Sequence, residues 1–125
     1  MTINNPYQTY QRQAVTTSKP EDLTLMLYQG MVKYIRLSKK ALREKKLEEC
    51  HSNNLRAQDI LSELMVTLKP GYDISDSLLQ LYDYMKNRLV EANFRKQADI
   101  LEEVEGFSVE LTEIWSEAIK HLRTK

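Results

Sequence analysis

The chain has 125 residues, and its 18 Lys and Arg residues balance its 18 Asp and Glu residues, so the formal net charge at pH 7 is zero. A balanced chain gives no electrostatic reason to expect nucleic acid as a partner. No segment approaches the roughly 20 apolar residues of a membrane span, so we expect a cytoplasmic protein without stable membrane insertion. Cys50 is the only cysteine, which excludes an internal disulfide and suits a reducing compartment.

Residues 1–17 differ in composition from the rest of the chain, because they are polar and carry a single charge. Asn5 followed by Pro6 is typical of a helix start, and Tyr7 and Tyr10 would share one face of that helix. A helix this short is unstable alone in water. We therefore expect a mobile N-terminal segment, helical or extended, that docks on an apolar surface or stays free.

The first long helix is predicted to run from Ser18 to about Lys46. Ser18 is a good N-cap, Pro20 fits the first turn because its missing N–H is not needed there, and Glu21 completes a Ser-x-x-Glu capping box. The basic run from Arg36 to Lys46 favours the negative end of the helix macrodipole and solubility, rather than a nucleic-acid contact.

This helix carries two apolar bands. The first repeats at helical spacing and predicts the core-facing side: Leu23, Leu27, Met31 and Tyr34. The second lies beside it, at steps of about 100° per residue: Leu25, Tyr28, Val32 and Ile35. Core packing accounts for one stripe about 100° wide, so the second band needs another cover. The N-terminal segment and a partner protein are both open as that cover.

Three further amphipathic helices follow. The second is predicted over residues 47–68, with Asn54 as a polar residue inside its apolar stripe, and it ends at the Pro70-Gly71 turn. The third opens near Ser75, and the fourth follows a break at residues 93–96. The fourth helix has these residues predicted to face inward: Ile100, Leu101, Val104, Phe107, Leu111, Ile114, Trp115, Ala118 and Leu122. Four such helices with short connections predict an all-α, antiparallel up-and-down four-helix bundle over residues 18–125.

Few residues are candidates for a catalytic or metal-binding site. Glu48 and His51 have the spacing used by di-iron bundles, but those sites need two such motifs and further inward carboxylates, so we expect no metal and no cofactor. A histidine phosphotransfer domain has Lys three residues and Gly four residues after its histidine, where this chain has Asn54 and Leu55. Cys50 lies on an apolar stripe and is interpreted as a small core residue. A phosphotransfer or metal-binding bundle is the alternative from another functional class.

Five segments, in order and at the right spacing, carry a resemblance to a known family: NPYQTY at 5–10, LTLMLYQG at 23–30, RAQDI at 56–60, LYDYM at 81–85 and NRLVEAN at 87–93. With these segments the chain resembles the flagellar secretion chaperone family FliS over nearly its full length. The resemblance implies a cytosolic, non-enzymatic chaperone. Such a protein binds the disordered C-terminal segment of flagellin, prevents premature polymerisation and delivers it to the flagellar type III export gate.

The partner-binding surface is predicted from the uncovered band and from the resemblance. Gln58 lies beside the inner stripe of the second helix, within reach of a partner backbone, and Ile60 lies at the edge of that stripe. The resemblance favours a partner role for the two N-terminal tyrosines after their release from the bundle, and a weak homodimer is left open. The predicted partner-binding residues are Tyr7, Tyr10, Leu25, Tyr28, Val32, Ile35, Gln58 and Ile60.

Overall fold

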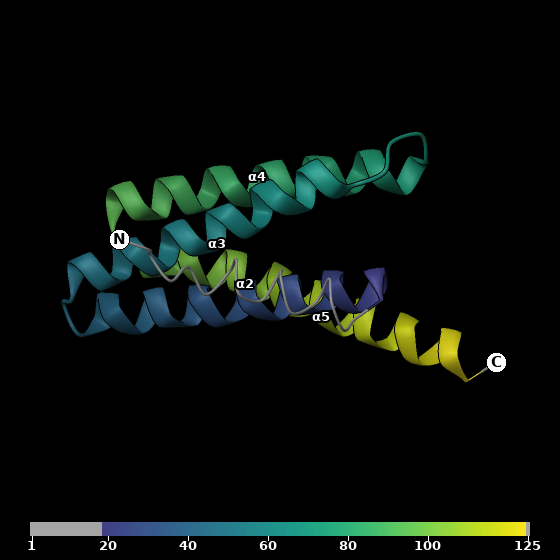
Figure 1. Ribbon diagram of the computed structural model, residues 1–125. Coiled ribbons are helices and arrows are strands. Elements are labelled where there is room, and N and C mark those ends of the chain that lie inside the picture. Colours follow the sequence, from purple (N-terminus) through teal and green to yellow (C-terminus); the bar gives the residue numbers. More distant parts are fainter. Residues whose placement is uncertain (1–18, 125) are drawn as a thin grey trace, which may run out of the picture.

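A computed structural model describes residues 19–124 (Figure 1). It contains four helices in chain order: α2 (Pro20–Arg43), α3 (Leu47–Thr67), α4 (Asp73–Arg95) and α5 (Ala98–Arg123). Successive helices run in opposite directions, as Figure 1 shows, and each packs against its neighbours in the chain. Packing of α2 against α5 closes the arrangement. The predicted all-α, antiparallel up-and-down four-helix bundle is confirmed, whereas the predicted N-terminal segment, residues 1–17, lies outside the described residues.

The start of α2 differs from the prediction. The N-cap is Lys19, without a side-chain cap hydrogen bond, and Pro20 is the first helical residue. A residue before proline is driven to extended backbone, and Lys19 adopts it with φ −74° and ψ 161°. The carbonyl of Lys19 then accepts the N–H groups of Asp22 and Leu23, each at 3.0 Å. The N-cap is therefore Lys19 and not the predicted Ser18, which itself lies outside the described residues.

The end of α2 comes at Arg43, earlier than predicted, because the chain turns through a left-handed residue. Lys45 has φ +60°, a conformation that usually favours glycine. The N–H of Lys46 donates to the carbonyl of Ala41 at 2.8 Å, and that of Lys45 donates to Leu42 at 3.1 Å. These two bonds form the Schellman pattern that closes helix C-termini. The end of α4 also lies at a left-handed residue, Lys96, within the predicted break.

The start of α4 also differs, because the helix opens at Asp73 and not near Ser75. Ser75 is buried in the first turn, and its hydroxyl donates to the carbonyl of Lys69 at 2.6 Å. This bond ties the start of the α3–α4 connection to the first turn of α4. Of the four described helices, none combines the length and apolar composition that crossing a membrane would require.

The core contains residues of both apolar bands of α2, and this corrects the idea of an uncovered second band. Tyr28 is 1% exposed and Ile35 is 0% exposed, and both belong to the main cluster of buried residues. The reason is that α2 lies between α3 and α5, so two of its sides are covered. Ile60 is also a core residue rather than an edge residue. A Cβ on Gly30 would lie 3.2 Å from Cδ1 of Ile60, which shows how closely α2 approaches α3 there.

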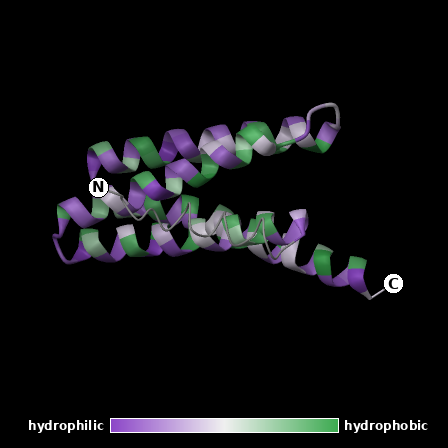
Figure 2. Ribbon diagram, in the orientation of Figure 1, coloured by the Kyte–Doolittle hydropathy of each residue, from purple (hydrophilic) through white to green (hydrophobic). Residues whose placement is uncertain are grey.

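The last turns of α5 depart from the predicted inward pattern. Ile114 and Leu122 are 65% and 61% exposed, Ala118 is exposed as well, and Ile119 is buried in their place. Figure 1 shows the C-terminal end of α5 extending past the other helices, and Figure 2 shows hydrophobic residues on these turns. Ile114 directly precedes Trp115, whose Nε1 donates to the carbonyl of Glu21 on α2, so helical spacing alone does not determine which residues of these turns are covered.

Candidate partner-binding surface

The predicted site residues separate into four groups. Tyr28, Ile35 and Ile60 lie in the core, and none of the three is on the surface of the described bundle. Leu25 is half-buried, Val32 lines a surface groove, and Gln58 is half-buried on α3. The two N-terminal tyrosines, Tyr7 and Tyr10, lie outside the described residues.

Tyr28 joins α2 to α4 across the middle of the bundle. Its hydroxyl forms a short hydrogen bond with the hydroxyl of Tyr82. Its ring stands edge-on to Trp115, with 6.2 Å between ring centroids. Burial raises the pKa of Tyr28 and of Tyr82 above the ordinary value of a phenol, so both hydroxyls stay protonated. The pair explains why a tyrosine on the apolar band of α2 is held inside.

Gln58 is held by a polar network inside the bundle. Asn54 is 1% exposed, and its Nδ2 donates to the backbone carbonyl of Leu89 on α4 at 3.0 Å. Gln58 Nε2 donates to Asn54 Oδ1 at 2.7 Å. The amide of Asn54 therefore links α3 to α4. Gln58 supports that link, so its polar head is already engaged.

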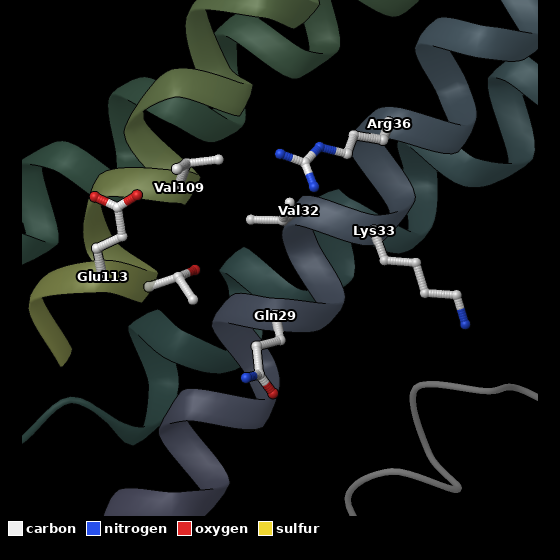
Figure 3. A pocket seen from close by; sticks show the side chains of 7 residues that line it. Gln29, Val32, Lys33, Arg36, Val109 and Glu113 are labelled. Atoms are coloured by element: carbon white, nitrogen blue, oxygen red, sulfur yellow. The ribbon is translucent and has the colours of Figure 1, made fainter. Parts of the chain in front are cut away.

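A groove between α2 and α5 is the surface that keeps part of the predicted site. It has a volume of about 390 Å³, and we call it the α2/α5 groove; its lining residues are Gln29, Val32, Lys33, Arg36, Val109, Thr112 and Glu113. Figure 3 shows Val32 and Arg36 reaching from α2 toward Val109 on α5, while Lys33 points away. Val32 is 9% exposed, the most exposed of the buried apolar residues described, and lies outside the main core cluster.

Short side chains create the floor of this groove. Val109 and Thr112 are half-buried on successive turns of α5, opposite Val32. Thr112 Oγ1 donates to the carbonyl of Ser108 at 2.7 Å, which leaves its methyl group as apolar lining. Gln29 and Glu113 are exposed at the rim. An apolar floor with a polar rim is the pattern of a surface that receives an amphipathic helix.

Beside Arg36 an ion-pair cluster closes one side of the groove. Glu105 of α5 accepts hydrogen bonds from Arg36 Nε at 2.8 Å and from Lys39 Nζ at 2.6 Å. Partial burial alone would raise the pKa of Glu105, but the two hydrogen bonds outweigh it and the pKa is lowered. The carboxylate therefore stays charged at neutral pH and holds α2 and α5 together at this point.

A second hollow, of about 360 Å³, lies at the end of the bundle where α2 begins. Side chains from all four helices line it, including Leu64, Leu78, Tyr82 and Trp115. Trp115 Nε1 donates to the carbonyl of Glu21 at 2.9 Å, which fixes the indole beside the hollow. Sequence analysis predicted neither this hollow nor the α5 wall of the groove. Both depend on how four helices meet, and helical spacing describes one helix at a time.

The residues considered for enzymatic chemistry have structural partners. His51 Nδ1 lies 2.7 Å from Asn93 Nδ2, so the amide of α4 donates to the ring. Cys50 is 1% exposed, and its backbone carbonyl accepts the hydroxyl of Ser38 at 2.8 Å. Within residues 19–124, no group of three or more His, Cys, Asp or Glu residues is placed to hold a metal ion.

Comparison with known proteins agrees with the resemblance noted from the sequence. The family model described as "Flagellar protein FliS" matches residues 3–122. A flagellar secretion chaperone FliS of Bacillus subtilis is 42% identical over 98% of this chain and 92% of its own length. One from Campylobacter jejuni is 29% identical over 94% of this chain and 93% of its own length.

A solved structure extends the agreement to the fold. The crystal structure of a bacterial flagellar chaperone superposes with a TM-score of 0.77 at 21% identity, covering 94% of this chain and 99% of that one. The family consists of chaperones and not of enzymes. The sequence match over nearly the whole chain, together with the four-helix fold, shows that this chain belongs to the FliS family of flagellar secretion chaperones.

Proposed function

We propose that this protein binds the disordered C-terminal segment of flagellin in the cytosol, keeps it from polymerising and brings it to the flagellar type III export gate. The observation that carries the proposal is the α2/α5 groove, with its apolar floor and polar rim, in a chain that belongs to an export chaperone family. A partner that becomes helical on binding would lay its apolar face on Val32 and Val109.

The energetics of such binding favour a long contact. Ordering a disordered segment costs several kcal/mol, so the segment must bury a large apolar area to bind. The groove alone is small. Leu25 lies one turn before Gln29 on the same side of α2 and is half-buried, so it would lengthen the apolar contact beyond the groove. We therefore assign the flagellin contact to Leu25, Val32, Val109 and Thr112, in place of the buried Tyr28, Ile35 and Ile60.

The N-terminal segment is part of the proposal. Residues 1–17 would shield part of this surface in the free chaperone, through Tyr7 and Tyr10, and flagellin would displace them. Displacement requires docking that is weak compared with flagellin binding, because a ligand shifts an equilibrium only by its differential affinity. The released tyrosines would then be available to the export gate. Hydrogen exchange of residues 1–17 should therefore become faster when flagellin is added, and slower exchange would contradict the displacement.

The test of flagellin binding is calorimetry with the C-terminal segment of flagellin from the same organism. Val109→Glu places a charge in the groove at a half-buried position, so we expect a loss of affinity of at least about tenfold, which corresponds to about 1.4 kcal/mol. The wild-type protein should bind one segment per chain with a large negative heat-capacity change.

The matched control is Val66→Glu, the same substitution at a valine of α3 that is 81% exposed. Both variants should keep the helical circular dichroism and melting of the wild type. Equal affinities of the Val109→Glu variant and the wild type would move the binding site elsewhere. Absence of binding by the wild-type protein would contradict the proposed function itself.

A further inference from the structure

The α2/α5 groove continues into a strongly basic hollow. The two share Lys33 and Arg36, and the hollow, about 590 Å³ in volume, is lined by five cations, one carboxylate and Leu37. The five cations are Lys33, Arg36, Lys39, Lys40 and Arg43, and the carboxylate is Glu105. We call this hollow the basic end of the groove. A chain with zero net charge therefore concentrates positive charge at one place.

Stabilisation of α2 accounts for only part of this cluster. Cations in the last turn of a helix complement its macrodipole, and Lys40 and Arg43 are in that turn. The macrodipole effect falls off within one turn, but the cluster begins at Lys33, nearly three turns before the helix ends. Two of its cations, Arg36 and Lys39, share the single carboxylate of Glu105. Within residues 19–124, neither Lys40 nor Arg43 has an ion-pair partner.

The opposite end of the groove carries the opposite charge. Glu113 is exposed at the rim on α5, and it forms no ion pair or hydrogen bond with another described residue. From Gln29 to Arg43 the groove follows 15 residues of α2, whose ends lie roughly 21 Å apart at a rise of 1.5 Å per residue. A partner helix of about four turns spans this length. Its two ends would meet opposite charges.

We infer that this charge order sets the direction of the bound partner helix, with its carboxyl end on the basic end of the groove and its amino end beside Glu113. The inference rests on the proposed function, because a C-terminal segment ends in a free carboxylate. A helix also carries about half a negative charge at its carboxyl end and half a positive charge at its amino end. The free carboxylate and the helix macrodipole both favour the same direction of the bound helix. Lys40 and Arg43 are the residues that receive the carboxylate.

The first test compares two synthetic peptides of the flagellin C-terminal segment, one with a free carboxylate and one with a C-terminal amide. The amide should bind the wild-type protein more weakly by about two- to fivefold, the range expected for an exposed charge pair. The double variant Lys40→Gln, Arg43→Gln should lose the difference between the two peptides while retaining binding. Lys120→Gln, a neutralisation near the far end of α5, is the matched control and should retain the difference.

The second test reads the direction itself. A nitroxide label on the carboxyl end of the peptide should broaden the amide signals of Lys40 and Arg43, and a label on the amino end should broaden those around Glu113. The reverse pattern, or equal binding of the acid and amide peptides by the wild-type protein, would overturn the inferred direction and leave the proposed function standing. If neither peptide binds, the proposed function fails as well.

Discussion

Tyr28 and Val32 lie one turn apart on α2 and belong to the same apolar band, yet the bundle uses them differently. Tyr28 is fully enclosed, where it meets Tyr82 of α4 and Trp115 of α5. Val32 faces the narrower space between α2 and α5, where the opposing residues are the short Val109 and Thr112. The difference in exposure follows the size of what stands opposite: the large rings of Tyr82 and Trp115 help to cover almost all of Tyr28, whereas the small side chains opposite Val32 leave a groove.

This contrast teaches that an apolar band wider than one stripe does not have to be a binding surface. Two neighbouring helices cover two sides of α2, and half of the second band, Tyr28 and Ile35, packs in the core cluster. The surface that remains for a partner is the α2/α5 groove, where the side chains opposite Val32 are short. Substitutions in the interior and in the groove should therefore have different effects.

The largest expected effect separates Ile35 from Val32. Ile35 is 0% exposed in the core cluster, so Ile35→Ala should lower the free energy of unfolding by about 3 kcal/mol, through lost burial and the cavity left behind. Val32→Ala removes fewer atoms at the wall of an existing groove and should cost about 1 kcal/mol or less. Urea unfolding followed by circular dichroism measures both values. Equal losses in the free energy of unfolding for the two variants would show that Val32 packs as a core residue and does not line a groove.

The next effect concerns the tyrosine pair of the interior. Tyr28→Phe leaves the hydroxyl of Tyr82 buried without its partner, so the free energy of unfolding should fall by about 1–3 kcal/mol. The double variant Tyr28→Phe, Tyr82→Phe removes both polar groups and should be closer to the wild type than either single variant. Thermal and urea unfolding of all four proteins form a double-mutant cycle. Additive losses would mean that the two hydroxyls do not depend on one another.

Helix order and the fold class followed from the sequence because local spacing contains them. Periodic apolar residues and the Pro70-Gly71 turn are decided by residues close together in the chain. The helix end at Arg43 was missed for the opposite reason: a left-handed turn is ordinarily predicted from glycine, and here the residue is Lys45. The left-handed conformation of Lys45 accompanies the two backbone hydrogen bonds that close the helix, from Lys45 to Leu42 and from Lys46 to Ala41.

The site was predicted less well than the fold. Helical spacing gives the angle of a residue around its own helix, and it does not say which side chain stands opposite or where a neighbouring helix ends. Tyr28 and Ile35 were therefore predicted as surface, and Ile114 and Leu122 as core. Val109 and Thr112 became candidates only when α5 was placed beside α2. Their valine and threonine side chains carry no signal that distinguishes a groove wall from an ordinary helix face.

The smallest expected effect concerns pH and the ion-pair cluster at the closed side of the groove. The pKa of Glu105 is lowered from the usual 4.5 in the folded protein, so its contribution to stability is present above pH 4.5 and is lost as the pH falls through the lowered pKa. Glu105→Gln should reduce the free energy of unfolding by about 1 kcal/mol at neutral pH, and this difference should shrink below about pH 4. Glu102→Gln is the matched control, since Glu102 is 65% exposed and lies 3.6 Å from Lys39, beyond good hydrogen-bond distance. It should change stability little at any pH. Urea unfolding from neutral to acid pH measures the three proteins, and a Glu105→Gln difference that persists unchanged in acid would show that packing, rather than charge, joins α2 to α5 beside the groove.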